Sequence, residues 1–83
     1  MSNDVTFVVR PGLRNLGWQV RSQTLLGEGA VGPRLAKGTR FPTEIGVDFE
    51  NKSDALRACQ SWHDWYYSQP YLKKKQKALK YVA

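Results

Sequence analysis

The chain has 83 residues, of which 41% are hydrophobic and 24% are charged, and this composition predicts one folded domain over residues 1–83 rather than disorder. Its single cysteine excludes an intramolecular disulfide, and no run approaches the roughly 20 apolar residues that a membrane span requires. The apolar run near the start is too short for a signal peptide, so we expect a cytoplasmic protein without membrane contact.

The net charge of +6 is unevenly distributed along the chain. Residues 1–43 carry a charge of +4, residues 44–67 carry −3, and residues 68–83 carry five lysines and no acid. If the two basic segments meet on one surface, the electrostatic field there would attract a polyanion. The alternative is that the positive charge serves solubility alone.

Two strands joined by a short connection are predicted at the start of the chain. Residues 5–10 and 16–23 both alternate, with Phe7 on the apolar face of the first strand and Trp18 on that of the second. Proline and glycine at positions 11 and 12 end the first strand, and a five-residue connection favours an antiparallel hairpin.

Residues 25–42 are rich in glycine and proline and follow no clear period, so we expect a mobile basic loop there. A short strand is expected within residues 31–36 or 39–41. The basic residues of this loop are Arg34, Lys37 and Arg40.

Residues 44–50 alternate strictly, which predicts a third or fourth strand. The apolar side chains of this strand, Ile45, Val47 and Phe49, are expected to face inward, and its acidic side chains are expected to face solvent.

A helix is predicted over residues 53–67, which form the core of the domain. Ser53 is placed to cap the first turn, and Asp54 lies where the helix dipole favours an anion. At about 100° per residue, one face of this helix is apolar and aromatic and the opposite face is polar. The apolar face consists of Ala55, Cys59, Trp62 and Tyr66, flanked by Leu56, Ala58, His63 and Trp65.

Residues 70–83 predict a second, short and basic helix. Pro70 suits the first turn of a helix, and the apolar side chains that follow fall mostly in one sector, with four lysines outside it. The whole chain therefore predicts an α+β fold. It consists of a small antiparallel sheet of three or four strands with a basic loop (residues 1–50), one amphipathic core helix (residues 53–67) and a short C-terminal basic helix (residues 70–83).

Two motifs resemble ligand sites, but we expect both to have a structural role and to bind no ligand. Residues 27–32 match G-x-G-x-x-G, yet Pro33 follows at once and no helix of useful length comes after it, so we expect a flexible glycine loop. Cys59 and His63 share one helical face at a spacing that metal ligands use, but a zinc site needs at least three protein ligands. We expect a buried thiol and a hydrogen-bonded histidine, no bound metal or cofactor, and no enzymatic activity.

The basic residues and nearby tyrosines favour a small, non-catalytic nucleic-acid-binding protein without sequence specificity. Lysines that meet phosphates release condensed counterions, and exposed rings stack on bases. The alternative is a small inhibitor or adaptor that docks on another protein, for example a nucleic-acid-processing enzyme, through its basic and aromatic surface. The residues expected to bind either partner are Lys73, Lys74, Lys77, Lys80, Arg14, Arg34, Lys37, Arg40, Tyr67 and Tyr81.

A homodimer through a sheet edge, at residues 5–10 or 44–50, is a further expectation, because an uncovered strand edge can pair with a second copy. The choice between DNA, RNA and a protein target stays open at this point.

Overall fold

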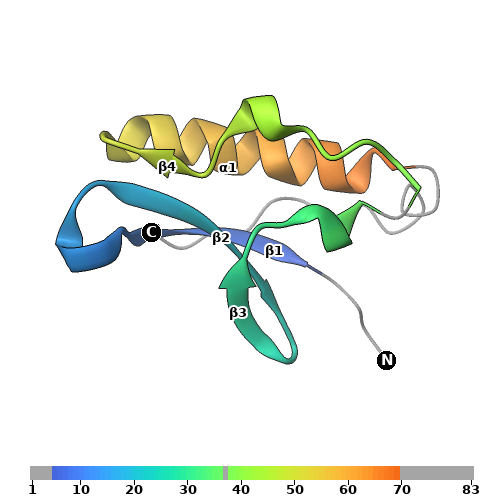
Figure 1. The fold of residues 1–83 in the computed structure, drawn as a ribbon, viewed down its shortest axis with the longest axis horizontal. Coiled ribbons are helices and arrows are strands. Elements are labelled where there is room, and N and C mark those ends of the chain that lie inside the picture. The colour runs from blue at the N-terminus through green and yellow to red at the C-terminus, as the bar shows by residue number, and fades with distance from the viewer. Residues whose placement is uncertain (1–4, 37, 70–83) are drawn as a thin grey trace.

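The computed structural model describes residues 5–36 and 38–69, and it shows an antiparallel sheet packed against one α-helix, α1 (Figure 1). The order of the elements is β1, β2, β3, β4 and α1, so the strands precede the helix that covers them. The predicted α+β class is confirmed. The predicted C-terminal basic helix, residues 70–83, lies outside the described residues, as does Lys37 of the loop.

Strands β1 (Thr6–Pro11) and β2 (Trp18–Thr24) form the predicted antiparallel hairpin. Its tip contains a short 3₁₀ helix, Leu13–Asn15, in which Arg14 and Asn15 have positive φ angles of 58° and 60°. The Gly12 amide donates to the Gly17 carbonyl at 3.0 Å and closes the connection. A methyl group at Gly12 would lie 2.3 Å from the Leu16 carbonyl oxygen, so the close approach requires glycine.

Strand β3 (Gly27–Ala30) pairs antiparallel with β2, which makes the first part of the glycine-rich segment a strand. Leu25 and Leu26 form the turn between them, and Gly27 has a φ of 127° that favours glycine. The prediction of a short strand within residues 31–36 or 39–41 is wrong, since neither segment forms a strand. The first of those segments holds the 3₁₀ helix Pro33–Leu35 instead, because its proline and glycine flanks favour a turn.

Strand β4 (Asp48–Phe49) is much shorter than the strand predicted over residues 44–50. A 3₁₀ helix, Thr43–Ile45, takes up the first part of that segment, and Gly46 then turns the chain at a φ of 81°. β4 pairs with the beginning of β2, on the same side of β2 as β3. The apolar residues of the segment 44–50 nevertheless face the core as predicted, since Ile45, Val47 and Phe49 all pack against it.

Helix α1 (Lys52–Tyr67) agrees closely with the prediction over residues 53–67. Asn51, rather than Ser53, holds the N-cap position, since the Ala55 amide donates to the Asn51 carbonyl at 3.2 Å and the helix begins one residue earlier. The predicted apolar face is confirmed, with one addition from the last turn. The buried residues of α1 are Ala55, Ala58, Cys59, Trp62, His63, Tyr66 and Tyr67.

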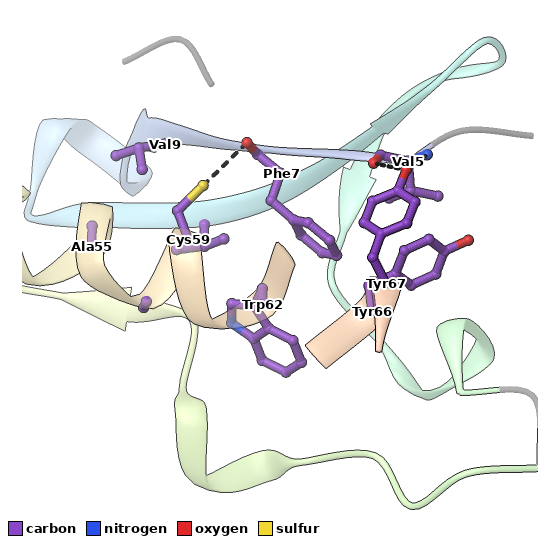
Figure 2. Close-up of a cluster of buried hydrophobic side chains, with 10 residues drawn as sticks. Val5, Phe7, Val9, Ala55, Cys59, Trp62, Tyr66 and Tyr67 are labelled. Carbon is purple, nitrogen blue, oxygen red and sulfur yellow. Dashed lines mark hydrogen bonds between the residues drawn. The ribbon is translucent and has the colours of Figure 1, made fainter. Parts of the chain in front are cut away.

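The core lies between α1 and the face of β1 and β2 that carries Phe7 and Val20 (Figure 2). Phe7 is fully buried and its ring stacks on Trp62 at 6.3 Å, while the ring of Tyr66 meets Phe7 edge-on at 6.0 Å. Burial of each large apolar side chain contributes about 1.5–3 kcal/mol. A few aromatic side chains thus provide much of the stability of a small domain.

Candidate functional site

Four of the ten predicted binding residues lie in the described part of the chain: Arg14, Arg34, Arg40 and Tyr67. The other six lie outside it, and their role stays a prediction. Arg14 is exposed at the tip that precedes β2. Arg34 is also exposed, and it lies near the other end of that strand. Its position follows from Gly29, which pairs with Ser22 of β2 and where an added methyl group would lie 3.8 Å from Arg34 Nη2. The structure therefore separates these two arginines by most of the length of β2.

Arg40 forms an exposed ion pair with Glu44, with Nη2–Oε2 and Nη1–Oε1 distances of 2.9 and 3.3 Å. The hydrogen bond to Glu44 raises the pKa of Arg40, and the same bond lowers the pKa of Glu44. Because a carboxylate already neutralises this guanidinium, Arg40 is a weaker phosphate ligand than its charge alone predicts.

Tyr67 corrects the prediction that its ring is free to stack on a base. The side chain is only 3% exposed, and its hydroxyl accepts from the Val5 amide at 3.2 Å and donates to the Val5 carbonyl at 2.8 Å (Figure 2). The ring also packs edge-on against Tyr66 at 4.9 Å. Tyr67 lies one residue beyond the predicted apolar face, and the aromatic contacts of the last helical turn bring it into the core.

The sheet face opposite α1 carries a polar network that sequence reasoning did not identify. Glu28 of β3 accepts from Arg10 Nε of β1 at 3.1 Å and from Arg21 Nε of β2 at 3.0 Å. Arg21 also donates to Gln19, and Gln19 donates in turn to Asp48 of β4 at 3.2 Å. The network joins all four strands. Its signal in the sequence is the alternation that places Arg10 and Arg21 on one face, but Glu28 could be assigned only once β3 was known.

The described part of the chain has a net charge close to zero, and most of its cations are paired. It contains seven arginines and lysines and six acids, a charge of +1, whereas the whole chain carries +6. Arg57 is paired as well, with Asp54 at 3.4 Å, and Lys52 Nζ lies 5.2 Å from the Trp18 ring. Only Arg14 and Arg34 are cations without an ion pair, a hydrogen bond or a ring contact from the side chain within residues 5–36 and 38–69.

Cys59 and His63 are both buried in the core, as predicted. The Cys59 thiol donates to the Phe7 carbonyl with an Sγ–O distance of 3.1 Å, and burial raises the pKa of the thiol to about 11. Its low thiolate content makes it a poor nucleophile. The His63 ring packs against the Tyr67 ring at 4.9 Å. Among the described residues, no group of three or more side chains is arranged to hold a metal ion.

Four leucines are strongly exposed, and all of them lie in the two hairpin connections. Leu13 and Leu16 flank Arg14 at the first tip, at 89% and 75% exposed, and Leu25 and Leu26 form the second tip, at 75% and 100%. Their exposure was not predicted: Leu16 was expected on the apolar face of the strand over residues 16–23, but β2 begins only at Trp18, which leaves Leu16 in the connection. Exposed apolar groups that are clustered in this way are typical of interaction surfaces.

The fold and these surfaces define a small α+β domain. Comparisons with protein-family models, with curated proteins and with solved structures found no match for this chain. Over residues 5–36 and 38–69, no helix combines the length and the apolar character needed to cross a membrane.

Proposed function

We propose that the protein is a small, non-catalytic nucleic-acid-binding protein whose lysine-rich segment, residues 73–80, contacts phosphates. The observation that carries the proposal is the separation of charge. The described fold is close to neutral and pairs most of its own cations, while the surplus positive charge lies mainly in the five lysines after α1. Since residues 68–83 contain no acid, these lysines have no intrasegment partner and suit a polyanion.

Arg14 and Arg34 are the additional contacts that the described fold supports. Their guanidinium groups are exposed and make no ion pair there, whereas Arg40 is engaged with Glu44. Because they lie toward opposite ends of β2, a single phosphate does not engage both. A backbone that runs along the sheet would meet them in turn, which is consistent with binding that does not depend on base sequence.

Fluorescence anisotropy of labelled single-stranded DNA, duplex DNA and RNA tests the proposal. We expect the native protein to bind at low salt and to lose affinity as salt rises. The slope of log K against log salt concentration should be about −0.7 to −0.9 per phosphate contact. Replacement of Lys73, Lys74, Lys77 and Lys80 by glutamine is expected to lower the affinity more than tenfold and to flatten the salt dependence. Absence of binding at low salt would refute the proposal.

A second candidate function is docking on another protein as an inhibitor or adaptor, which the exposed leucines favour. At the first hairpin tip, the exposed Leu13 and Leu16 flank Arg14, which has no ion pair among the described residues. Arginine is enriched at binding hot spots, and exposed apolar patches mark interaction surfaces. A nuclease-treated lysate passed over the native protein and over a Leu13→Lys, Leu16→Lys variant tests it. A stoichiometric protein retained by the native chain and lost by the variant supports docking at this tip, whereas equal retention excludes it.

A further inference from the structure

The sheet has one edge that the fold itself protects, along β1. Val5, which precedes β1, and Phe7 and Val9 within β1 direct their carbonyl groups away from β2, because Val9 pairs with Val20 and Val20 bonds to Val47 on the other side of β2. Side chains bond to these three carbonyl groups as a neighbouring strand would. Tyr67 bonds both backbone groups of Val5, Cys59 donates to Phe7, and Arg10 Nη1 donates to the Val9 carbonyl at 3.4 Å. Such occupation disfavours pairing with another chain. The edge at residues 5–10, predicted as a dimer edge, is therefore a poor one.

The opposite edge, along β3, is open in the described part of the chain. The Val20 amide donates to Val47 on the β3 and β4 side of β2, so Ser22 and Thr24 also direct their backbone groups to that side. They pair with Gly29 and Gly27, whose carbonyl groups also accept from the Ser22 and Thr24 hydroxyls. This pairing leaves the amide and carbonyl groups of Glu28 and Ala30 directed outward. Both residues are exposed, and no described strand pairs with them. β4, at two residues, is too short to offer a comparable edge.

Apolar surface adjoins this open edge. Leu25 and Leu26 lie at the near end of β3, and Leu26 is fully exposed. A hollow of about 300 Å³ opens alongside, with Leu26, Gly29 and Leu35 among the residues that line it. Gly29 needs neither a positive φ nor a close approach within the monomer, and the absence of a side chain there keeps the hollow open.

We propose that the β3 edge is a self-association surface whose occupant is a second copy of this chain, paired antiparallel through a two-fold axis at Gly29. Glu28 of each copy then bonds to Ala30 of the other, because these are the residues whose backbone groups face outward. Leu26 of each copy lies beside Gly32 of the other and reaches its hollow. One surface thus supplies both halves of the interface.

The local charge at this edge includes both paired and unpaired groups. Glu28, the one acid on β3, is held between Arg10 and Arg21, so two copies do not bring unpaired carboxylates together. The like charges that oppose association are the +6 of each whole chain and the Arg34 guanidinium, which lies beside Gly29 and therefore near the two-fold axis. Salt screens this repulsion, so self-association is strengthened by salt while nucleic-acid binding is weakened by it. The two activities are therefore distinguishable in one titration.

Sedimentation velocity of the full chain over a concentration series, at low and at high salt, tests the proposal. A short strand pair with a few apolar contacts makes a small interface, so we expect a reversible dimer in the micromolar range or weaker. Ala30→Pro removes only an outward amide, which β2 does not use, and is expected to weaken the dimer about tenfold or more. Ala30→Ser keeps the amide and is expected to retain the dimer.

A second pair of variants guards against misfolding of the proline variant. Leu26→Lys changes a fully exposed side chain at the β3 tip and is expected to weaken dimerisation, while Leu13→Lys makes the same change at the distant β1–β2 tip and is expected to leave it unchanged. A native chain that stays monomeric at high concentration and high salt overturns the proposal. Equal effects of the two lysine variants, or none from Leu26→Lys, also overturn it, because the contact then lies elsewhere.

Discussion

Two regions of this domain are held in place by different means. The β1–β2 hairpin and α1 meet through large apolar side chains, among them Phe7 and Trp62, which are almost fully buried. The segment between them, residues 25–50, is rich in glycine and proline, and its apolar side chains pack against the core but are only partly buried. Individual hydrogen bonds from α1 and the residues after it help to position the backbone of this segment. Trp62 Nε1 donates to the Gly46 carbonyl at 2.8 Å, and Gln69 Nε2 donates to the Leu35 carbonyl at 3.3 Å.

The difference shows how a small chain can fix a segment whose apolar side chains are only partly buried. The hydrophobic effect is non-directional, whereas a hydrogen bond to one carbonyl specifies one backbone position. Trp62 takes part in both, since its ring is in the core and its Nε1–H group holds the turn before β4. Substitutions that separate these two contributions therefore test the comparison.

The largest effect is expected for Trp62→Phe. This change keeps an aromatic ring in the core but leaves a cavity and removes the donor to the Gly46 carbonyl. We expect a loss of about 2–4 kcal/mol in the free energy of unfolding, measured by urea titration. Trp65→Phe is the matched control, because Trp65 is only half-buried and its Nε1 makes no hydrogen bond among the described residues, and it should cost much less. Equal losses would show that the bond to Gly46 adds nothing.

A smaller effect is expected for Gly46→Ala in the intervening segment. Gly46 has φ 81° and ψ 163°, a region that is almost restricted to glycine, so a side chain there costs about 1–3 kcal/mol. The control is Gly32→Ala, since Gly32 has an ordinary φ of −150° and open space around it. Thermal unfolding of both variants checks the prediction, and a similar decrease in Tm for the two would contradict it.

The smallest effect is expected from the titration of Cys59. Burial raises the pKa of its thiol to about 11, so the unfolded chain loses its proton at a lower pH than the folded chain. The contribution is fully present below the unfolded pKa and is lost as pH rises toward 11, by up to about 2 kcal/mol. Stability measured from pH 8 to 10.5 should therefore fall more steeply for the native chain than for Cys59→Ala. Parallel curves would place the thiol in a more solvated site.

The strands and the helix with strong apolar periodicity were predictable, and the polar and glycine-rich parts were not. The pattern of β1, β2 and α1 reflects which side chains are buried, and burial is what the core requires. β3 has little side-chain pattern of its own, and its pairing with β2 defines it as a strand. β4 is shorter than predicted because Gly46 turns the chain at a positive φ angle, which the alternation of apolar and polar residues does not reveal.

The candidate site was less predictable than the fold. Charge runs identify basic residues but not their partners, so the pairing of Arg40 with Glu44 and the hydrogen bonds of Tyr67 became clear only in three dimensions. The lysines of residues 73–80 remain a prediction from charge and spacing. The exposure of the four leucines was not predictable, since it depends on the two turns, and the alternation that placed Leu16 on an apolar strand face was misleading.

The most direct test of the account compares two variants of equal charge by nucleic-acid anisotropy. Lys73→Gln with Lys74→Gln removes two cations from the lysine-rich segment, and Arg40→Gln with Arg57→Gln removes two that are paired on the fold. The account predicts that the first variant loses several-fold more affinity and more of the salt dependence than the second. Equal losses would contradict it, because binding would then follow net charge rather than the separation of charge between the segment and the fold.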